Sequence, residues 1–275
     1  MSKRRRKRRQ SYTFSSLVVA IIILVGGWFF TGSQPNDITS LIQNISRSTL
    51  NQTKNVNATS ELAKLDYHSG EQSFIEINHN KATLNPTKWQ SNHVVYSDLD
   101  NANRTSRGNI AYLESRNLAS DENRVRQYVE PTGWHQKFID RQPIINRGHL
   151  IAYSISKGIN TDGSYNPHDT SGDQNNPKNL FTQTAFSNQR IQTIFEQKIR
   201  DALKDGKRVI FFSRPIFRGS ELMARGIHLE AISTDKSLNF NVYLFNVQPN
   251  VKFDYATGRS TIDRGMKFRN HNIRN

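Results

Sequence analysis

The chain has 275 residues, a formal net charge of +15 and no cysteine, and hydrophobic residues make up 35% of it. The lack of cysteine excludes disulfide bonds, thiol nucleophiles and cysteine-bound zinc. The length allows one domain with a sizeable core, and the low hydrophobic content predicts that part of the chain lies outside that core.

The positive charge is spread along the chain. Residues 3–9 supply seven basic side chains, and the rest of the chain keeps a net charge of about +8. A basic body suits a polyanionic partner such as nucleic acid, because phosphates neutralised by basic side chains release their counterions. Charge that only maintains solubility explains the composition equally well, so the charge alone does not decide the partner.

An apolar run follows the basic block. Residues 17–30 read LVVAIIILVGGWFF, with three aromatic residues at the far end, where a membrane interface favours them. We expect residues 1–13 to be a basic cytoplasmic segment, residues 14–32 a single transmembrane signal anchor, and the body to lie outside the cell. A cleaved signal peptide, which would release the body as a secreted protein, is the alternative.

Residues 33–66 are rich in Ser, Thr, Asn and Gln, which predicts a flexible tether. The folded domain is expected over residues 67–275. Loops and helices are expected first, around Pro86, Trp89 and residues 131–134, and a loop rich in Gly, Asn, Asp and Pro over residues 158–179.

Alternating apolar residues predict the strands of this domain. They lie at residues 74–78, 208–212, 226–231 and 240–247, and the chain between residues 141 and 149 is expected to run as a strand into a turn. The connections between the later strands are too short for helical crossovers. The sequence therefore predicts an α+β fold with a central, mostly antiparallel sheet flanked by helices.

A helix is expected over residues 185–204, ended by Asp205-Gly206. Asn188, Gln192, Glu196 and Arg200 recur every four residues and form one polar stripe beside an apolar one. At the α-helical rise, Asn188 and Glu196 are about 12 Å apart, too far to bind one ion directly together. Asn188 could hold a hydrated Mg²⁺ that Glu196 reaches through water. A surface helix with polar i,i+4 pairs is the simpler alternative.

Residues 146–149, Asn-Arg-Gly-His, form the second candidate group. His149 has an ordinary pKa near 6.5, which suits a general base at neutral pH. Gly148 permits close backbone approach, and Arg147 could bind a phosphate through two parallel hydrogen bonds. An isolated histidine is more often structural than catalytic. Among the other histidines, we expect His228 to be structural and His168 to lie on the surface.

The Asn-Arg-Gly-His motif resembles the Asp-Arg-Gly-His motif of the DNA/RNA non-specific endonucleases, which have the ββα-metal fold. The downstream spacing of Asn179, Gln183, Asn188 and Glu196 is similar too. Over about residues 67–260, the chain is most similar to the membrane-anchored, competence-associated DNA-entry nucleases of Gram-positive bacteria. Asn146 replaces the usual Asp, which removes a charge beside the histidine but keeps an acceptor oxygen.

The resemblance implies a metal-dependent, sequence-non-specific endonuclease that acts on DNA, with RNA as a second substrate, and leaves 5′-phosphates. Mg²⁺ is the implied cofactor, with Mn²⁺ as an alternative, and the cell membrane and the DNA-uptake machinery are the implied partners. Seven residues receive roles: His149 as general base, Asn188 as metal ligand, Glu196 as holder of metal-bound water, Arg147 and Arg200 as stabilisers of phosphate charge, Asn179 as support of the site, and Arg104 as a phosphate-binding residue.

Two other functions fit parts of the sequence. A non-catalytic surface receptor for DNA uptake agrees with the basic body and the tether, but such a receptor needs lysines and aromatic residues rather than the spacing of Asn188 and Glu196. A secreted toxin-type nuclease would use the same chemistry, and a cleaved signal peptide would favour it over a membrane-anchored nuclease.

Overall fold

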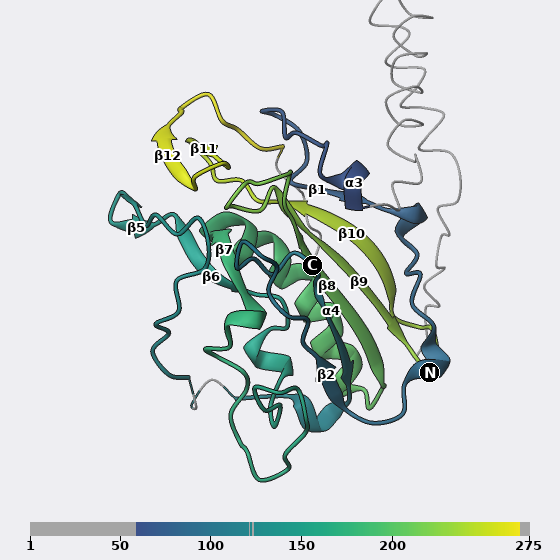
Figure 1. The fold of residues 1–275 in the computed structure, drawn as a ribbon. Coiled ribbons are helices and arrows are strands. Elements are labelled where there is room, and N and C mark those ends of the chain that lie inside the picture. The colour runs from purple at the N-terminus through teal and green to yellow at the C-terminus, as the bar shows by residue number, and fades with distance from the viewer. Residues whose placement is uncertain (1–58, 121, 123, 270–275) are drawn as a thin grey trace, which may run out of the picture. The chain divides into compact units, whose positions relative to one another are not determined.

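The computed structural model describes residues 59–269 except residues 121 and 123. Its centre is a six-stranded sheet in which every neighbouring pair of strands is antiparallel (Figure 1). In spatial order the strands are β1 (Phe74–Glu76), β10 (Asn239–Phe245), β9 (Gly226–Ser233), β8 (Val209–Ile216), β3 (Asn109–Leu113) and β2 (His93–Val95). The expected α+β class and antiparallel sheet are confirmed.

One face of this sheet packs against helix α4 (Thr193–Lys204) (Figure 1). Phe195 and Ile199 of the helix share a core with Phe211 of β8 and Leu229 of β9, and all four are at most 3% exposed. These are the alternating strand positions and the apolar helix stripe that the sequence indicates. Burial of each such side chain stabilises the fold by about 1.5–3 kcal/mol.

A second antiparallel pair lies beside the helix. Strand β6 (Ile145–His149) contains the Asn-Arg-Gly-His motif and pairs with β7 (Leu180–Thr184), so that His149 lies opposite Leu180. The chain then continues through a helical stretch into α4. Two strands followed by a helix are the order of elements expected from the motif.

The region from residue 79 to residue 140 differs from the expectation of loops and helices. It contributes β2 and β3, which complete one edge of the main sheet, and its helical elements are single 3₁₀ turns. These strands are short, and their apolar residues are consecutive instead of alternating with polar ones, so the alternation typical of a strand is weak in the sequence. The short 3₁₀ turns of the described chain are η1 (Asn78–Asn80), η2 (Pro86–Lys88), η3 (Ser115–Asn117), η5 (Tyr153–Ile155) and η6 (Pro177–Asn179).

Two small hairpins extend beyond the main sheet. They are formed by β4 (Phe138–Ile139) with β5 (Gln142–Pro143), and by β11 (Val251–Asp254) with β12 (Arg259–Ile262). Lys137, just before β4, donates a hydrogen bond from Nζ to the Ser260 carbonyl of β12 at 3.4 Å. The two hairpins are therefore neighbours.

The helix expected over residues 185–204 is not α-helical throughout. A π-helical segment, Ser187–Gln192, precedes α4. Because a π-helix bonds residue i to residue i+5, it winds more residues into each turn and rotates Asn188 relative to Glu196. The regular α-helix expected over residues 185–204 is therefore interrupted before Glu196.

The N-terminal part of the described chain packs on the body. Helix α3 (Thr59–Leu62) buries Leu62 to 1% exposure among Ile77, Tyr243 and Phe245. The rest of the expected tether over residues 33–66, the basic segment and the expected transmembrane anchor lie outside the described residues. Among the described residues, no helix combines the length and hydrophobicity needed to cross a membrane.

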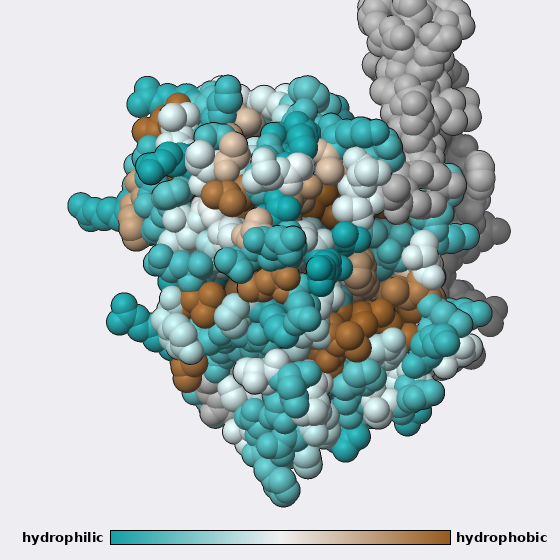
Figure 2. Space-filling model, viewed as in Figure 1, coloured by the Kyte–Doolittle hydropathy of each residue, from teal (hydrophilic) through white to brown (hydrophobic). Residues whose placement is uncertain are grey.

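The surface on the side shown in Figure 2 is mostly hydrophilic, and hydrophobic side chains form separate patches between polar ones. Isolated apolar side chains are normal on a protein surface, whereas a large continuous patch would indicate a partner or a membrane. This face therefore has no broad apolar surface of that kind.

Asn246, which follows β10, joins β7 to the segment before β9. Its side-chain oxygen accepts from the Thr184 amide at 2.8 Å, and its amide donates to the carbonyls of Thr182 and Ala224 at 3.0 and 2.9 Å. Asn246 is 1% exposed. Its side chain thus satisfies three buried backbone groups that belong to two different elements.

We predict that Asn246→Ala lowers the free energy of unfolding by about 2–4 kcal/mol, because it leaves several buried backbone groups unpaired. Urea unfolding followed by circular dichroism measures the loss. Asn239→Ala, at an exposed position that accepts one hydrogen bond from Ala82, is the control and should cost less than about 1 kcal/mol. Equal losses in the two variants would contradict this account.

Candidate active site

An open cleft of about 800 Å³ lies between β6 and the helix. The structure brings five of the seven residues implied by the motif to this cleft. They are Arg147, His149, Asn188, Glu196 and Arg200. Asn146, at the position where the motif usually has Asp, also lines the cleft.

Gly148 allows the helix to approach β6 closely. A Cβ atom added to this residue would lie 2.2 Å from Gln183 Oε1 and 2.6 Å from Gln183 Cβ, which is closer than atoms can approach. The buried Gln183 side chain occupies this space and donates to Ser187 Oγ at 3.1 Å and to Gln192 Oε1 at 2.9 Å. The glycine of the motif is therefore required by packing against β7 and the helix.

Gln192 connects the strand to the helix inside the site. Its side chain is fully buried, and Nε2 donates to the His149 carbonyl at 2.9 Å and to Glu196 Oε1 at 2.8 Å. Burial raises the pKa of Glu196, while the Gln192 hydrogen bond and the charge of Arg200 act in the opposite direction. Glu196 is only 8% exposed, so the hypothesis of a plain surface helix is wrong.

His149 is partly buried at the end of β6. Its Nε2 atom lies 3.3 Å from the Gln174 carbonyl and 3.2 Å from the Gln127 side-chain amide. Burial lowers the pKa of His149 to about 4; the Gln174 carbonyl opposes this, and the positive charge of Arg124 adds to it. His149 is therefore neutral at physiological pH, and the tautomer with unprotonated Nε2 can accept a proton there.

Two of the arginines that line the cleft, Arg147 and Arg200, are held in place by neighbouring groups. Arg147 donates from Nε to the Val129 carbonyl, and its guanidinium lies 4.4 Å from the centre of the Trp134 ring. Arg200 donates to Ser154 Oγ at 3.1 Å and lies 3.9 Å from Glu196 Oε2. Fixed guanidinium groups can bind phosphate oxygens with little loss of side-chain entropy.

Asn179 does not line the cleft. It is fully buried, and its side chain exchanges two hydrogen bonds with the backbone of Ile151, at 2.9 Å to the amide and 3.0 Å to the carbonyl. Its own carbonyl accepts from the Leu150 amide at 2.9 Å. Asn179 thus holds the backbone of the two residues that follow His149, so it supports the cleft without lining it.

The structure does not bring Arg104 to the cleft. Its guanidinium donates to Asp100 at 2.9 Å and to the carbonyls of Gly219 and Glu221 at 2.8 Å each. It also lies 4.9 Å from the centre of the Phe217 ring. Arg104 does not line the cleft, and its Nε and Nη1 atoms donate within the fold, so its expected role in phosphate binding stays a prediction that this position does not favour.

The cleft contains side-chain oxygen atoms that could act as ligands of a hydrated divalent cation. The Asn188 side chain is partly exposed and makes no hydrogen bond among the described residues, and Glu196 is hydrogen-bonded through Oε1 only. No group of three or more His, Cys, Asp or Glu in the described chain could hold a metal. Mg²⁺ prefers oxygen ligands and keeps several waters, so few protein ligands suffice for it.

Sequence reasoning missed the role of the segment before β4. Arg124 and Gln127 line the cleft, and Arg124 affects the pKa values of both His149 and Glu196. Three arginines in residues 116–126 were the signal that could have indicated a basic cleft wall. Their distance from the motif in the sequence hid the connection, because only the fold brings this segment to β6.

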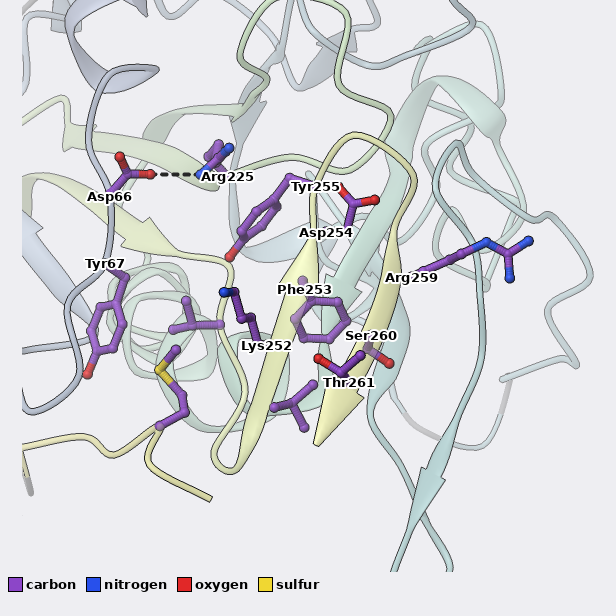
Figure 3. A pocket seen from close by; sticks show the side chains of 13 residues that line it. Asp66, Tyr67, Arg225, Lys252, Phe253, Asp254, Tyr255, Arg259, Ser260 and Thr261 are labelled. Atoms are coloured by element: carbon purple, nitrogen blue, oxygen red, sulfur yellow. Dashed lines mark hydrogen bonds and ion pairs between the residues drawn. The ribbon is translucent and has the colours of Figure 1, made fainter. Parts of the chain in front are cut away.

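A second cavity of about 590 Å³ lies elsewhere, beside the β11–β12 hairpin (Figure 3). Its charged groups Asp66 and Arg225 are paired at 2.7 Å, and Arg225 also pairs with Glu221. Tyr255 donates from its hydroxyl to the Asn246 carbonyl at 2.8 Å. None of the residues implied by the motif lines this cavity, whereas five of them line the cleft at β6.

Comparison with known proteins agrees with the geometry of the cleft. Residues 80–235, more than half of the chain, match the family model described as DNA/RNA non-specific endonuclease. The chain belongs to the DNA/RNA non-specific endonuclease family. The family resemblance expected from the motif is thereby confirmed.

Two solved structures of one nuclease support the same assignment, and a third structure shows a weaker similarity. NucA from Streptococcus agalactiae with a bound magnesium ion is 32% identical, with a TM-score of 0.59 over 72% of this chain and 89% of that chain. The same protein with no metal bound gives a TM-score of 0.58 with the same coverage. The Sda1 nuclease with a bound zinc ion is 19% identical, with a TM-score of 0.48 over 68% of this chain and 95% of that chain.

The low pKa of His149 predicts a pH-dependent stability. Between about pH 6.5 and pH 4 the unfolded chain binds a proton at this position and the folded chain does not, so protonation favours unfolding. As pH falls through this range, we expect the free energy of unfolding of wild type to decrease by up to about 3 kcal/mol relative to that of His149→Gln. Above pH 6.5, where the histidine is neutral in both states, the full stability is present. Urea unfolding at several pH values measures the difference, and a constant difference would contradict the buried, neutral histidine.

Proposed function

We propose that this endonuclease hydrolyses phosphodiester bonds of DNA without sequence specificity, using His149 as general base and one hydrated Mg²⁺. A cleft that contains a neutral histidine, a buried carboxylate, a free amide oxygen and two fixed arginines carries the proposal. RNA is a second substrate to be tested in the same assay, because the groups in the cleft favour phosphate and not the sugar.

Asn188 would hold the ion directly, and Glu196 would hold it through an intervening water. When bound, the ion neutralises charge on the scissile phosphate and stabilises the leaving 3′ oxygen. Mn²⁺ has the same preference for oxygen ligands and is the alternative ion.

His149 takes a proton from the attacking water at the ring nitrogen that is unprotonated in the neutral imidazole. Gln192 donates a hydrogen bond to the His149 carbonyl, and Asn179 forms two hydrogen bonds with the backbone of Ile151. These bonds fix the backbone at the end of β6, so the imidazole keeps its position. Arg147 and Arg200 bind the phosphate oxygens and compensate the charge that develops in the transition state. Attack by water on the phosphorus breaks the P–O3′ bond and leaves a 5′-phosphate and a 3′-hydroxyl, whose proton comes from solvent.

We predict that His149→Ala lowers turnover about 10²- to 10⁴-fold while DNA binding stays close to wild type, because proton transfer is lost and the cationic groups remain. Plasmid cleavage and gel retardation measure the two properties. Near-normal cleavage by the purified variant would exclude His149 as the base. DNA binding by a wild type that does not cleave would favour the receptor function instead.

We predict that Asn188→Ala raises the Mg²⁺ concentration needed for half-maximal cleavage by about tenfold or more, because the ion loses its direct protein ligand. EDTA should abolish cleavage by wild type. Gln189→Ala removes an exposed amide from the adjacent position of the same cleft and is the matched control. An unchanged metal titration for Asn188→Ala would remove Asn188 from the metal site.

We also propose that the nuclease domain lies at the outer cell surface, anchored by residues 14–32 with residues 1–13 in the cytoplasm, and acts beside the DNA-uptake machinery. The basic block followed by an uncharged apolar run supports this orientation. Protease treatment of intact cells should remove the nuclease domain. Its full protection, or its release into the medium as a shorter chain, would contradict the anchor.

A further inference from the structure

The β4–β5 hairpin rises from the wall of the cleft. Trp134 and Gln136 precede the hairpin, Pro143 closes it, and all three residues line the cleft. None of these residues has a part in the proposed chemistry except through the contact between Trp134 and Arg147. The position of the hairpin next to the cleft requires a separate explanation.

Phe138 is exposed on this hairpin, and although it does not line the cleft, its cross-strand partner Pro143 does. It pairs with Pro143 across the two strands, and directly paired residues project from the same face of an antiparallel pair. Its neighbour Ile139 projects from the opposite face and packs on the cluster of Ile144 and Phe253. Phe138 is 62% exposed, so its ring is accessible to a ligand.

The base of the hairpin is held rigidly. Gln136 donates from Nε2 to the Ile145 carbonyl at 2.9 Å, and the Ile144 amide donates to the Lys137 carbonyl at 3.0 Å. The hydrogen bond from Lys137 Nζ to Ser260 ties the hairpin to β12. An exposed ring on a rigid support binds a planar partner with little loss of conformational entropy.

The tip of the hairpin has two non-glycine residues in the left-handed region, Asp140 with φ 50° and Arg141 with φ 64°. A two-residue turn with positive φ at both positions matches the twist of the strands and keeps the hairpin short. Arg141 is exposed and makes no ion pair among the described residues. The same short hairpin therefore carries an exposed phenyl ring and, three residues later in its turn, an exposed arginine.

We infer that Phe138 stacks on an unpaired nucleobase of the bound strand and so positions single-stranded or locally unpaired nucleic acid in the cleft. The inference rests on the proposed function and adds a preference of the enzyme for unpaired strands. An aromatic ring next to cationic groups is the combination that binds single strands without reading sequence, because every base has a flat face. A paired base inside a duplex does not offer that face.

The experiment measures binding of a fluorescent oligothymidine and of a fully paired hairpin DNA to the full-length protein in detergent, in EDTA so that no cleavage occurs. Phe138→Ala should weaken binding of the single strand roughly tenfold and binding of the duplex much less. The dependence of binding on salt should stay unchanged, because stacking releases no counterions. Phe138→Trp should restore binding, and its added fluorescence should be quenched by the oligothymidine.

Ile262→Ala is the matched control, since Ile262 is 59% exposed on β12 and does not line the cleft. It should leave both affinities unchanged. Equal affinities of wild type and Phe138→Ala for the single strand would overturn the inference, and so would equal losses for single strand and duplex. Cleavage by wild type in Mg²⁺ is scored separately, so that failure of the proposed function and failure of the stacking contact give different results.

Discussion

The buried side chain of Gln192 is the interaction on which the rest of the site depends. It donates to the carbonyl of His149 and to the carboxylate of Glu196, and it accepts from Gln183 of β7. A buried amide costs stability unless its groups are paired, and these pairings exist only when β6, β7 and the helix are in register. The network therefore couples correct packing of the ββα unit to the position of the histidine.

Packing around this network explains several residues together. Gly148 leaves room for Gln183, and the π-helical segment Ser187–Gln192 sets the rotation at which Gln192 and Asn188 leave the helix. Local π-helical turns occur often at functional sites. Asn179 and Asn246 then satisfy buried backbone groups on either side of β7. Buried amides thus do much of the positioning in a chain without disulfide bonds.

Much of this architecture could be predicted from the sequence. Alternation indicated β8, β9 and β10, and the stripe of Asn188, Glu196 and Arg200 indicated one polar helix face. The sequence did not reveal β2 and β3, whose short strands depend on the edge of the sheet, or the π-helical segment, which depends on tertiary contacts. It also did not reveal the pairing of Arg104 with Asp100 and two distant carbonyls, which exists only in the folded chain.

The central claim is that His149 and Glu196 act in one catalytic step. A double-mutant cycle on plasmid cleavage, with His149→Ala, Glu196→Gln and both changes in full-length protein, tests it most directly. Groups that act as a unit lose activity non-additively, so the account predicts that the double variant is about as slow as His149→Ala alone. Losses that multiply, or near-normal cleavage by either single variant, would contradict the account.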